Sequence, residues 1–233
     1  LATRMVPIAD GSDMGGSLRN PASFCNVVGF RPSTGRVPTW PSDNAWFSFG
    51  VQGPMARNVQ DVSLMLAAIA GPDPRVPLSI TEPSEQFLGS LDIDLRGKRV
   101  AFAPTLGGLP VCREVVKVIE EQRRIFTELG CEVVDACLDF DKANDVFRIL
   151  RGFRFAMKFG GLVDQHREQM KETVLWNISE GKKLSGEDIA NAQRWRTELF
   201  DRAAKFFEQF DFLVGPVTQV PPFNIEDQFV SEI

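Results

Sequence analysis

The sequence is short of several residues on which common sites are built. Among its 233 residues there are one histidine and four cysteines, and no two cysteines form a CxxC pair. A Cys/His zinc site is therefore excluded, because it needs about four such ligands at close spacing. A Ser-His-Asp triad has only His166 to use, and we expect this residue at the surface because its neighbours are polar. We expect free, mostly buried cysteines, with disulfides as the alternative, which suits a reducing compartment such as the cytoplasm.

An excess of basic residues and long apolar runs are also missing. Lys and Arg number 26 against 31 Asp and Glu, so the net charge is -5. This balance argues against nucleic acid or an anionic membrane as the main partner, because phosphates are bound by clustered basic side chains. No stretch approaches the ~18 apolar residues of a membrane-spanning helix, and no signal peptide is visible. Because the sequence begins at Leu1 and not at Met, the missing leader excludes nothing.

The order of apolar runs, glycines and prolines predicts an α/β protein. Residues 1–58 predict loops and brief strands. Further strands are expected at 98–103, 131–137 and 212–215. Helices are expected at 59–70, at 111–129 and over most of 142–209, the first of them largely buried. The strand, helix and strand between 98 and 137 have the spacing of a right-handed parallel crossover. The last helix is expected to start with a capping box of Ser185 and Asp188.

The most informative stretch is a glycine-rich loop in which Gly15 and Gly16 precede Ser17. Glycines have no Cβ, so they permit a tight turn in which successive backbone N–H groups converge near the serine hydroxyl. Acyl-transfer enzymes need this arrangement, because fixed donors must meet the oxyanion of the tetrahedral intermediate. The alternative is a glycine-rich turn with a buried serine that has no chemical role.

Two other catalytic loops are excluded by the residues on either side of the serine. A phosphate-binding loop requires Lys immediately before the hydroxyl residue, where Gly16 stands. A nucleophile elbow requires Gly two positions after it, where Arg19 stands. A serine hydroxyl is a poor nucleophile without an adjacent base. The base must then be a lysine, a carboxylate or a residue outside this sequence.

Residues 11–37 resemble the core motif of the amidase signature family. The shared letters are GSDMGGSLRNPA from 11 to 22, Cys25, GFRPS from 29 to 33 and GRV from 35 to 37. Shorter segments that are similar to the same family lie at 53–57, 95–101 and 211–216. The resemblance implies a partial amidase signature fold, with a central mixed β-sheet flanked by helices.

The resemblance also implies that residues 1–233 are part of a single amidase domain. We expect four parts: the nucleophile loop and short strands (1–58), a helix, connection and strand (59–104), a helical variable region (105–209), and a strand and loop (210–233). Acyl specificity is expected to come from the variable region. The 19 phenylalanines fit core packing better than an aromatic acyl pocket.

The family uses a Ser–cis-Ser–Lys triad, and the resemblance implies a role for seven residues of the loop. Ser17 matches the nucleophile. The backbone N–H groups of the oxyanion hole match those of Met14, Gly15, Gly16 and Ser17. The residues that support the loop match Ser12, Asp13 and Arg19. For Asp13 and Arg19 the alternative is a solvated surface pair.

The sequence departs from the family pattern before Ser17. Only sixteen residues precede it, and they contain neither a lysine nor the Gly/Ser-rich segment that carries the cis-serine. We therefore expect an internal fragment, inactive by itself, of a hydrolase that converts a carboxylic amide to an acid and ammonia or an amine through an acyl-enzyme.

The resemblance implies no metal and no organic cofactor. A small-molecule amide is the expected substrate and partner, neither nucleic acid nor a membrane is expected, and a homodimer is left open. The alternative functions are an amidase-like subunit of an amidotransferase complex, which transfers glutamine-derived ammonia, and a non-catalytic binding homologue.

Overall fold

The computed structural model describes residues 1–230 and 232–233, which divide into two compact units. The first unit contains residues 1–95, 110–122 and 216–233, and the second contains 96–109 and 123–215. Helices and small sheets build both units, so the α/β class is confirmed. The described strands form two three-stranded sheets, one antiparallel and one parallel. That the chain is part of a single four-part domain stays a prediction.

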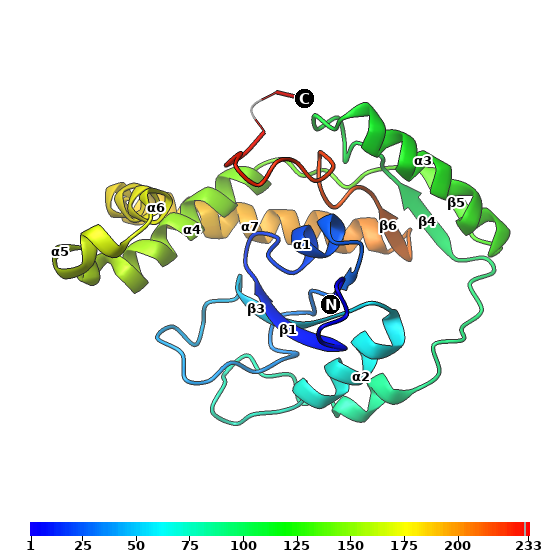
Figure 1. The fold of residues 1–233 in the computed structure, drawn as a ribbon, viewed down its shortest axis with the longest axis horizontal. Helices are drawn as coiled ribbons and strands as arrows, with labels where there is room; N and C mark the ends of the chain where they lie inside the picture. The colour runs from blue at the N-terminus through cyan, green and yellow to red at the C-terminus, as the bar shows by residue number, and fades with distance from the viewer. Residues whose placement is uncertain (231) are drawn as a thin grey trace. The chain divides into compact units, whose positions relative to one another are not determined.

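The first unit is built on the antiparallel sheet. Strand β3 (Val51–Ala56) is in the middle, between β1 (Ile8–Asp13) and the two-residue β2 (Val28–Gly29). Strands β1 and β3 run side by side in Figure 1, with Gly11 opposite Gly53. A Cβ at either glycine would lie 3.0 or 2.8 Å from a methyl group of Leu18. The two glycines thus leave the room that Leu18 fills, directly after Ser17.

Two helices of the first unit differ from what the sequence predicts. The apolar pattern does not predict α1 (Arg19–Phe24), which is only six residues long. Helix α2 (Val59–Ile69) confirms the helix expected at 59–70. The expectation that it is largely buried is wrong, because only Val62 and Leu66 are buried while Val59 and Leu64 are more than half exposed. A 3-10 turn, η1 (Ser84–Leu88), lies in the connection that follows.

The second unit contains the parallel sheet. Strand β4 (Arg99–Phe102) lies between β5 (Glu132–Asp135) and β6 (Phe212–Val214), parallel to both. Its residues Val100 and Ala101 are fully buried, as expected of an apolar central strand. Helix α3 (Arg113–Glu128) connects β4 to β5, with its residues 113–122 in the first unit. The strand, helix and strand predicted between 98 and 137 are therefore confirmed.

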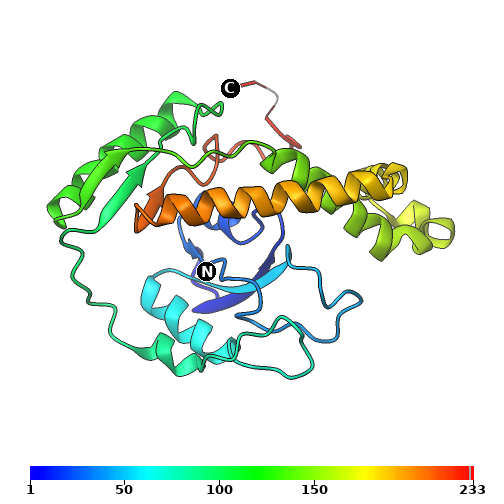
Figure 2. The ribbon, with the colours of Figure 1, turned by 180° about the vertical axis from the view of Figure 1, so that it is seen from behind.

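The rest of the second unit is helical, as predicted for 142–209. Its elements are α4 (Ala143–Phe159), η2 (Gly160–Leu162), α5 (Val163–His166), η3 (Arg167–Gln169), α6 (Glu172–Lys183) and α7 (Gly186–Phe207). Helix α4 packs against both α6 and the long α7, which Figure 2 shows from behind. The capping box is confirmed, since the Asp188 N–H donates to Ser185 Oγ (3.1 Å) and the Ser185 N–H donates to Asp188 Oδ2 (2.8 Å).

The remaining surface predictions have mixed outcomes. His166 is exposed, as expected. None of the four cysteines forms a disulfide in the described part of the chain, but only Cys131 is buried, so the expectation that most are buried is wrong. No helix among the described residues is both long and apolar enough to span a bilayer.

Candidate active site

Ser17 lies in a short loop between a strand and a helix. The strand β1 ends at Asp13 and the helix α1 begins at Arg19, so residues 14–18 form the connection. Ser17 is exposed, whereas its neighbours Gly16 and Leu18 are buried. The loop is thus anchored on both sides of a serine that projects from the surface of the first unit.

The carboxylate of Asp13 holds this loop by hydrogen bonds from four residues. Oδ1 accepts from the Gly16 N–H (2.8 Å) and Oδ2 accepts from the Leu18 N–H (3.2 Å). Arg19 donates from Nε and Nη2 to the two carboxylate oxygens (2.9 and 3.0 Å). Arg31 adds a bond from Nη1 to Oδ1 (3.1 Å). Asp13 is fully buried, so the alternative of a solvated surface pair with Arg19 is wrong.

The environment of Asp13 keeps its side chain ionised. Burial by itself raises the pKa of this carboxyl group. The hydrogen bond and positive charge of Arg19, together with the N–H groups of Gly16 and Leu18, outweigh burial and hold the pKa well below its ordinary range. The buried negative charge is therefore a permanent anchor for the loop at neutral pH.

The four amides that were expected to line an oxyanion hole are not equivalent. The Gly16 N–H donates to the Asp13 carboxylate. It is therefore not available as an oxyanion donor, contrary to the expectation. Within residues 1–230 and 232–233, the N–H groups of Met14, Gly15 and Ser17 have no hydrogen-bond partner, and neither has the Ser17 hydroxyl. Gly16 has φ +113°, and a Cβ on it would lie 2.7 Å from the Asn20 side chain, so glycine is required there.

Two residues differ from the sequence prediction of which residues support the Ser17 loop. Ser12 is exposed on β1, opposite Gln52, and the structure does not bring its side chain into the Asp13 cluster. Arg31, which we assigned no role from the sequence, bonds both Asp13 and the carbonyl of Phe49 (2.8 Å). Its position in the shared GFRPS segment was the available signal.

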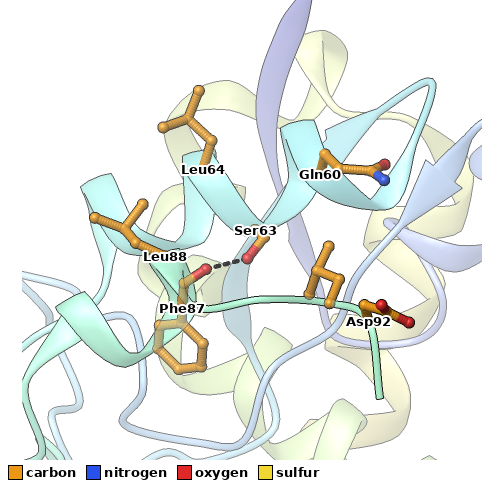
Figure 3. A pocket seen from close by; sticks show the side chains of 8 residues that line it. Gln60, Ser63, Leu64, Phe87, Leu88 and Asp92 are labelled. Atoms are coloured by element: carbon orange, nitrogen blue, oxygen red, sulfur yellow. Dashed lines mark hydrogen bonds between the residues drawn. The ribbon is translucent and has the colours of Figure 1, made fainter. Parts of the chain in front are cut away.

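Two cavities are lined by residues outside the Ser17 loop. In the first unit, a cavity of about 500 Å³ lies between α2 and residues 87–92. Figure 3 shows its lining, where the Ser63 hydroxyl donates to the Phe87 carbonyl and Asp92 is the one ionisable side chain. A cavity of about 660 Å³ lies in the second unit. Among the described residues, no group of three or more His, Cys, Asp or Glu is placed to hold a metal ion.

Comparison with known proteins identifies the family. The family model described as Amidase matches residues 1–232. The chain belongs to the amidase signature family. This match includes the Ser17 loop and both compact units of the chain.

Individual relatives support the same assignment. The chain is 31% identical to an acylamidase of Rhodococcus erythropolis, over 97% of this chain and 48% of that protein. It is 35% identical to a subunit of the glutamyl-tRNA(Gln) amidotransferase of Thioalkalivibrio sulfidiphilus, over 98% of this chain and 52% of that protein. The chain spans about half the length of these relatives.

A solved structure confirms the amidase signature fold. The structure of a bacterial aryl acylamidase of the amidase signature family superposes with a TM-score of 0.87 at 29% identity. The match covers 95% of this chain and 48% of that one. The two small sheets and the helices described above therefore belong to this fold.

Proposed function

We propose that the protein to which this chain belongs hydrolyses a carboxylic amide to an acid and ammonia or an amine, through an acyl-enzyme on Ser17. The observation that carries the proposal is an exposed serine on a loop that a buried, ionised Asp13 holds in place. Such a loop keeps the hydroxyl accessible while its backbone is fixed, which nucleophilic catalysis requires. The acylamidase relative supports the reaction class.

The oxyanion is proposed to be held by backbone amides of the same loop. Met14, Gly15 and Ser17 have N–H groups without a partner in the described chain and are the donors we favour. Gly16 acts through its conformation and through its bond to Asp13. Loss of one such donor typically costs about 3 kcal/mol of transition-state stabilisation.

The proton on the Ser17 hydroxyl must go to a base outside this chain. By the family resemblance, a neutral lysine accepts it through the cis-serine, and Ser17 Oγ forms a bond to the amide carbon. The cis-serine then protonates the leaving nitrogen as the C–N bond breaks. Water finally attacks the acyl-enzyme, releases the acid and restores the Ser17 hydroxyl. We accordingly propose that residues 1–233 alone are inactive.

A second function is favoured by one observation, the 35% identity to the amidotransferase relative. In that case the same Ser17 chemistry would release ammonia for a partner instead of into solution. Turnover of simple amides by the isolated protein supports the hydrolase. Ammonia transfer that depends on a partner chain supports the amidotransferase.

The absence of disulfides among the four described cysteines fits a reducing compartment, so a cytoplasmic location stays part of the proposal.

Substitution of Ser17 tests the proposal directly. A fluorophosphonate label should map to Ser17, and Ser17→Ala should lower amide turnover by at least about 10³-fold with the melting temperature unchanged. Ser23→Ala, at an exposed position on α1, is the matched control and should keep its activity. Retention of more than about 1% of the rate in Ser17→Ala, or labelling elsewhere, rejects the assignment of the nucleophile.

A further inference from the structure

The second unit contains a cavity with three aromatic side chains in its wall. It has a volume of about 660 Å³ and lies among α4, α6 and α7. Phe147 of α4, Trp176 of α6 and Trp195 of α7 line it, and Trp176 is 54% exposed. Cavities that bind small molecules have volumes of about 300–1,000 Å³ and mostly apolar, aromatic walls. The volume and the three aromatic side chains fit a small aromatic ligand.

The acidic side chains of the cavity are already neutralised. Asp145 pairs with Lys142 of the same helix end at 3.5 Å. Glu180 pairs with Lys183, also of its own helix, at 2.6 Å. Each carboxylate of the cavity therefore has a lysine of its own chain segment as its partner.

The two arginines of the cavity have no such acidic partner. In the described part of the chain, Arg148 makes no ion pair, and the only hydrogen bond of Arg151 goes from Nε to the neutral Oδ1 of Asn177 (3.0 Å). The lining thus carries two arginines that have no carboxylate partner within the described residues. Guanidinium groups are suited to carboxylates, because their paired N–H donors match the two carboxylate oxygens.

The position of Arg151 is fixed before any ligand arrives. Asn177 is 6% exposed, and its Nδ2 donates to the Thr173 carbonyl (2.7 Å), so its Oδ1 is held toward Arg151. The guanidinium of Arg151 also lies over the Phe147 and Phe155 rings, at 5.7 and 5.2 Å from their centroids. A donor group that is held in place loses little entropy on binding.

We propose that this cavity binds an aromatic carboxylate. The ring lies against Trp176 and Trp195, and the carboxylate pairs with Arg148 and Arg151. Binding is non-covalent and uses no residue of the Ser17 loop. The inference therefore goes beyond the proposed hydrolysis and does not depend on it.

Calorimetric titration with two probes of the same shape tests the ligand class. We expect 2-naphthoate to bind at least about tenfold more tightly than the neutral 2-naphthalenemethanol. Added salt should weaken the naphthoate and leave the alcohol unaffected, because only the first relies on charge. Equal affinities for the two probes, or no binding of naphthoate, overturn the proposal.

Substitutions locate the binding to this cavity. Arg148→Gln and Arg151→Gln should each weaken naphthoate at least about fivefold without changing the affinity for the alcohol, and Trp176→Ala should weaken both probes. Arg148 is exposed and makes no ion pair within the described residues, so its variant is expected to fold. The matched control is Arg167→Gln, an exposed arginine outside the cavity, and it should bind like the unaltered protein.

The outcomes separate this proposal from the hydrolase proposal. Arg148→Gln and Arg151→Gln variants that bind naphthoate as tightly as Arg167→Gln reject the cavity as the site. Ser17→Ala should keep full naphthoate affinity whether or not it has lost amide turnover. A loss of naphthoate binding in Ser17→Ala means that the probe occupies the catalytic site and overturns the inference.

Discussion

Asp13 and Arg19 form a bidentate ion pair across the loop that carries Ser17. Arg19 Nε lies 2.9 Å from Oδ2 and Nη2 lies 3.0 Å from Oδ1, so both carboxylate oxygens are engaged. Asp13 is the last residue of β1 and Arg19 is the first of α1. The pair therefore fixes the distance between the strand and the helix, and with it the position of the serine between them.

The first prediction concerns the charge of this pair. Asp13→Asn leaves Arg19 and Arg31 without their buried counter-charge and should lower the free energy of unfolding by about 3 kcal/mol. This value is at the lower end for buried pairs, because Arg19 is 45% exposed. Urea unfolding measures the change, and amide turnover should fall as the loop loosens. Asp10→Asn, at an exposed position on the same strand, is the control, and an equal loss in both variants would contradict the role given to Asp13.

The second prediction is the pH dependence of the same group. Because its folded-state pKa is lowered, Asp13 contributes its full stabilisation above the unfolded pKa of about 3.9 and loses it progressively as the pH falls below that value. The stability gap between the unaltered protein and Asp13→Asn should be constant from about pH 7 to about pH 5 and shrink below about pH 4. Unfolding free energies at several pH values measure the gap. A gap that does not shrink as the pH falls below about 4 would mean that the pKa is not lowered.

The third prediction concerns the backbone of the loop. Gly16→Ala places a Cβ at φ +113° and 2.7 Å from the Asn20 side chain, so it should cost about 2 kcal/mol and displace the Ser17 hydroxyl. Turnover should fall more steeply than stability, which separate rate and melting measurements would show. Gly50→Ala is the control, since a Cβ there meets nothing within 4 Å. Full activity in Gly16→Ala would show that the turn needs no glycine.

The parts of the fold that follow from the sequence are those with a regular period or a local cap. The strand at 98–103 contains a continuous apolar run, and the helix at 111–129 has an apolar stripe of helical period. The Ser185 capping box needs only two residues three positions apart. Helix α1 has six residues, too few to show a helical period. The exposure of Val59 and Leu64 depends on what packs against α2, which no local pattern contains.

The candidate site also has parts that can be predicted from the sequence and parts that cannot. Ser17 and its glycines are recognisable from their order along the chain. The bond between Arg31 and Asp13 joins residues 18 positions apart, and it forms only because β2 and β1 both pair with β3. The use of the Gly16 N–H by Asp13 depends on the turn geometry, so the sequence could name four amides but could not distinguish them.

The last prediction concerns the glycines at which α4 and α6 cross. A Cβ on Gly181 would lie 1.9 Å from the carbonyl oxygen of Gly152, whereas a Cβ on Gly152 would lie 3.3 Å from the Gly181 backbone. Backbone atoms cannot move aside as a side chain does, so Gly181→Ala should destabilise the protein by about 3 kcal/mol and Gly152→Ala by less.

Gly186→Ala is the matched control for this pair, because it adds a Cβ in open space at the start of α7. It should stabilise the protein by up to about 1 kcal/mol, as alanine favours the helix. Thermal unfolding of the three variants should therefore rank them in the order Gly186→Ala, Gly152→Ala and Gly181→Ala, from most to least stable. Because α4 and α6 both line the second-unit cavity, Gly181→Ala should also weaken naphthoate binding. A Gly181→Ala variant as stable as Gly186→Ala would show that the two helices do not cross this closely.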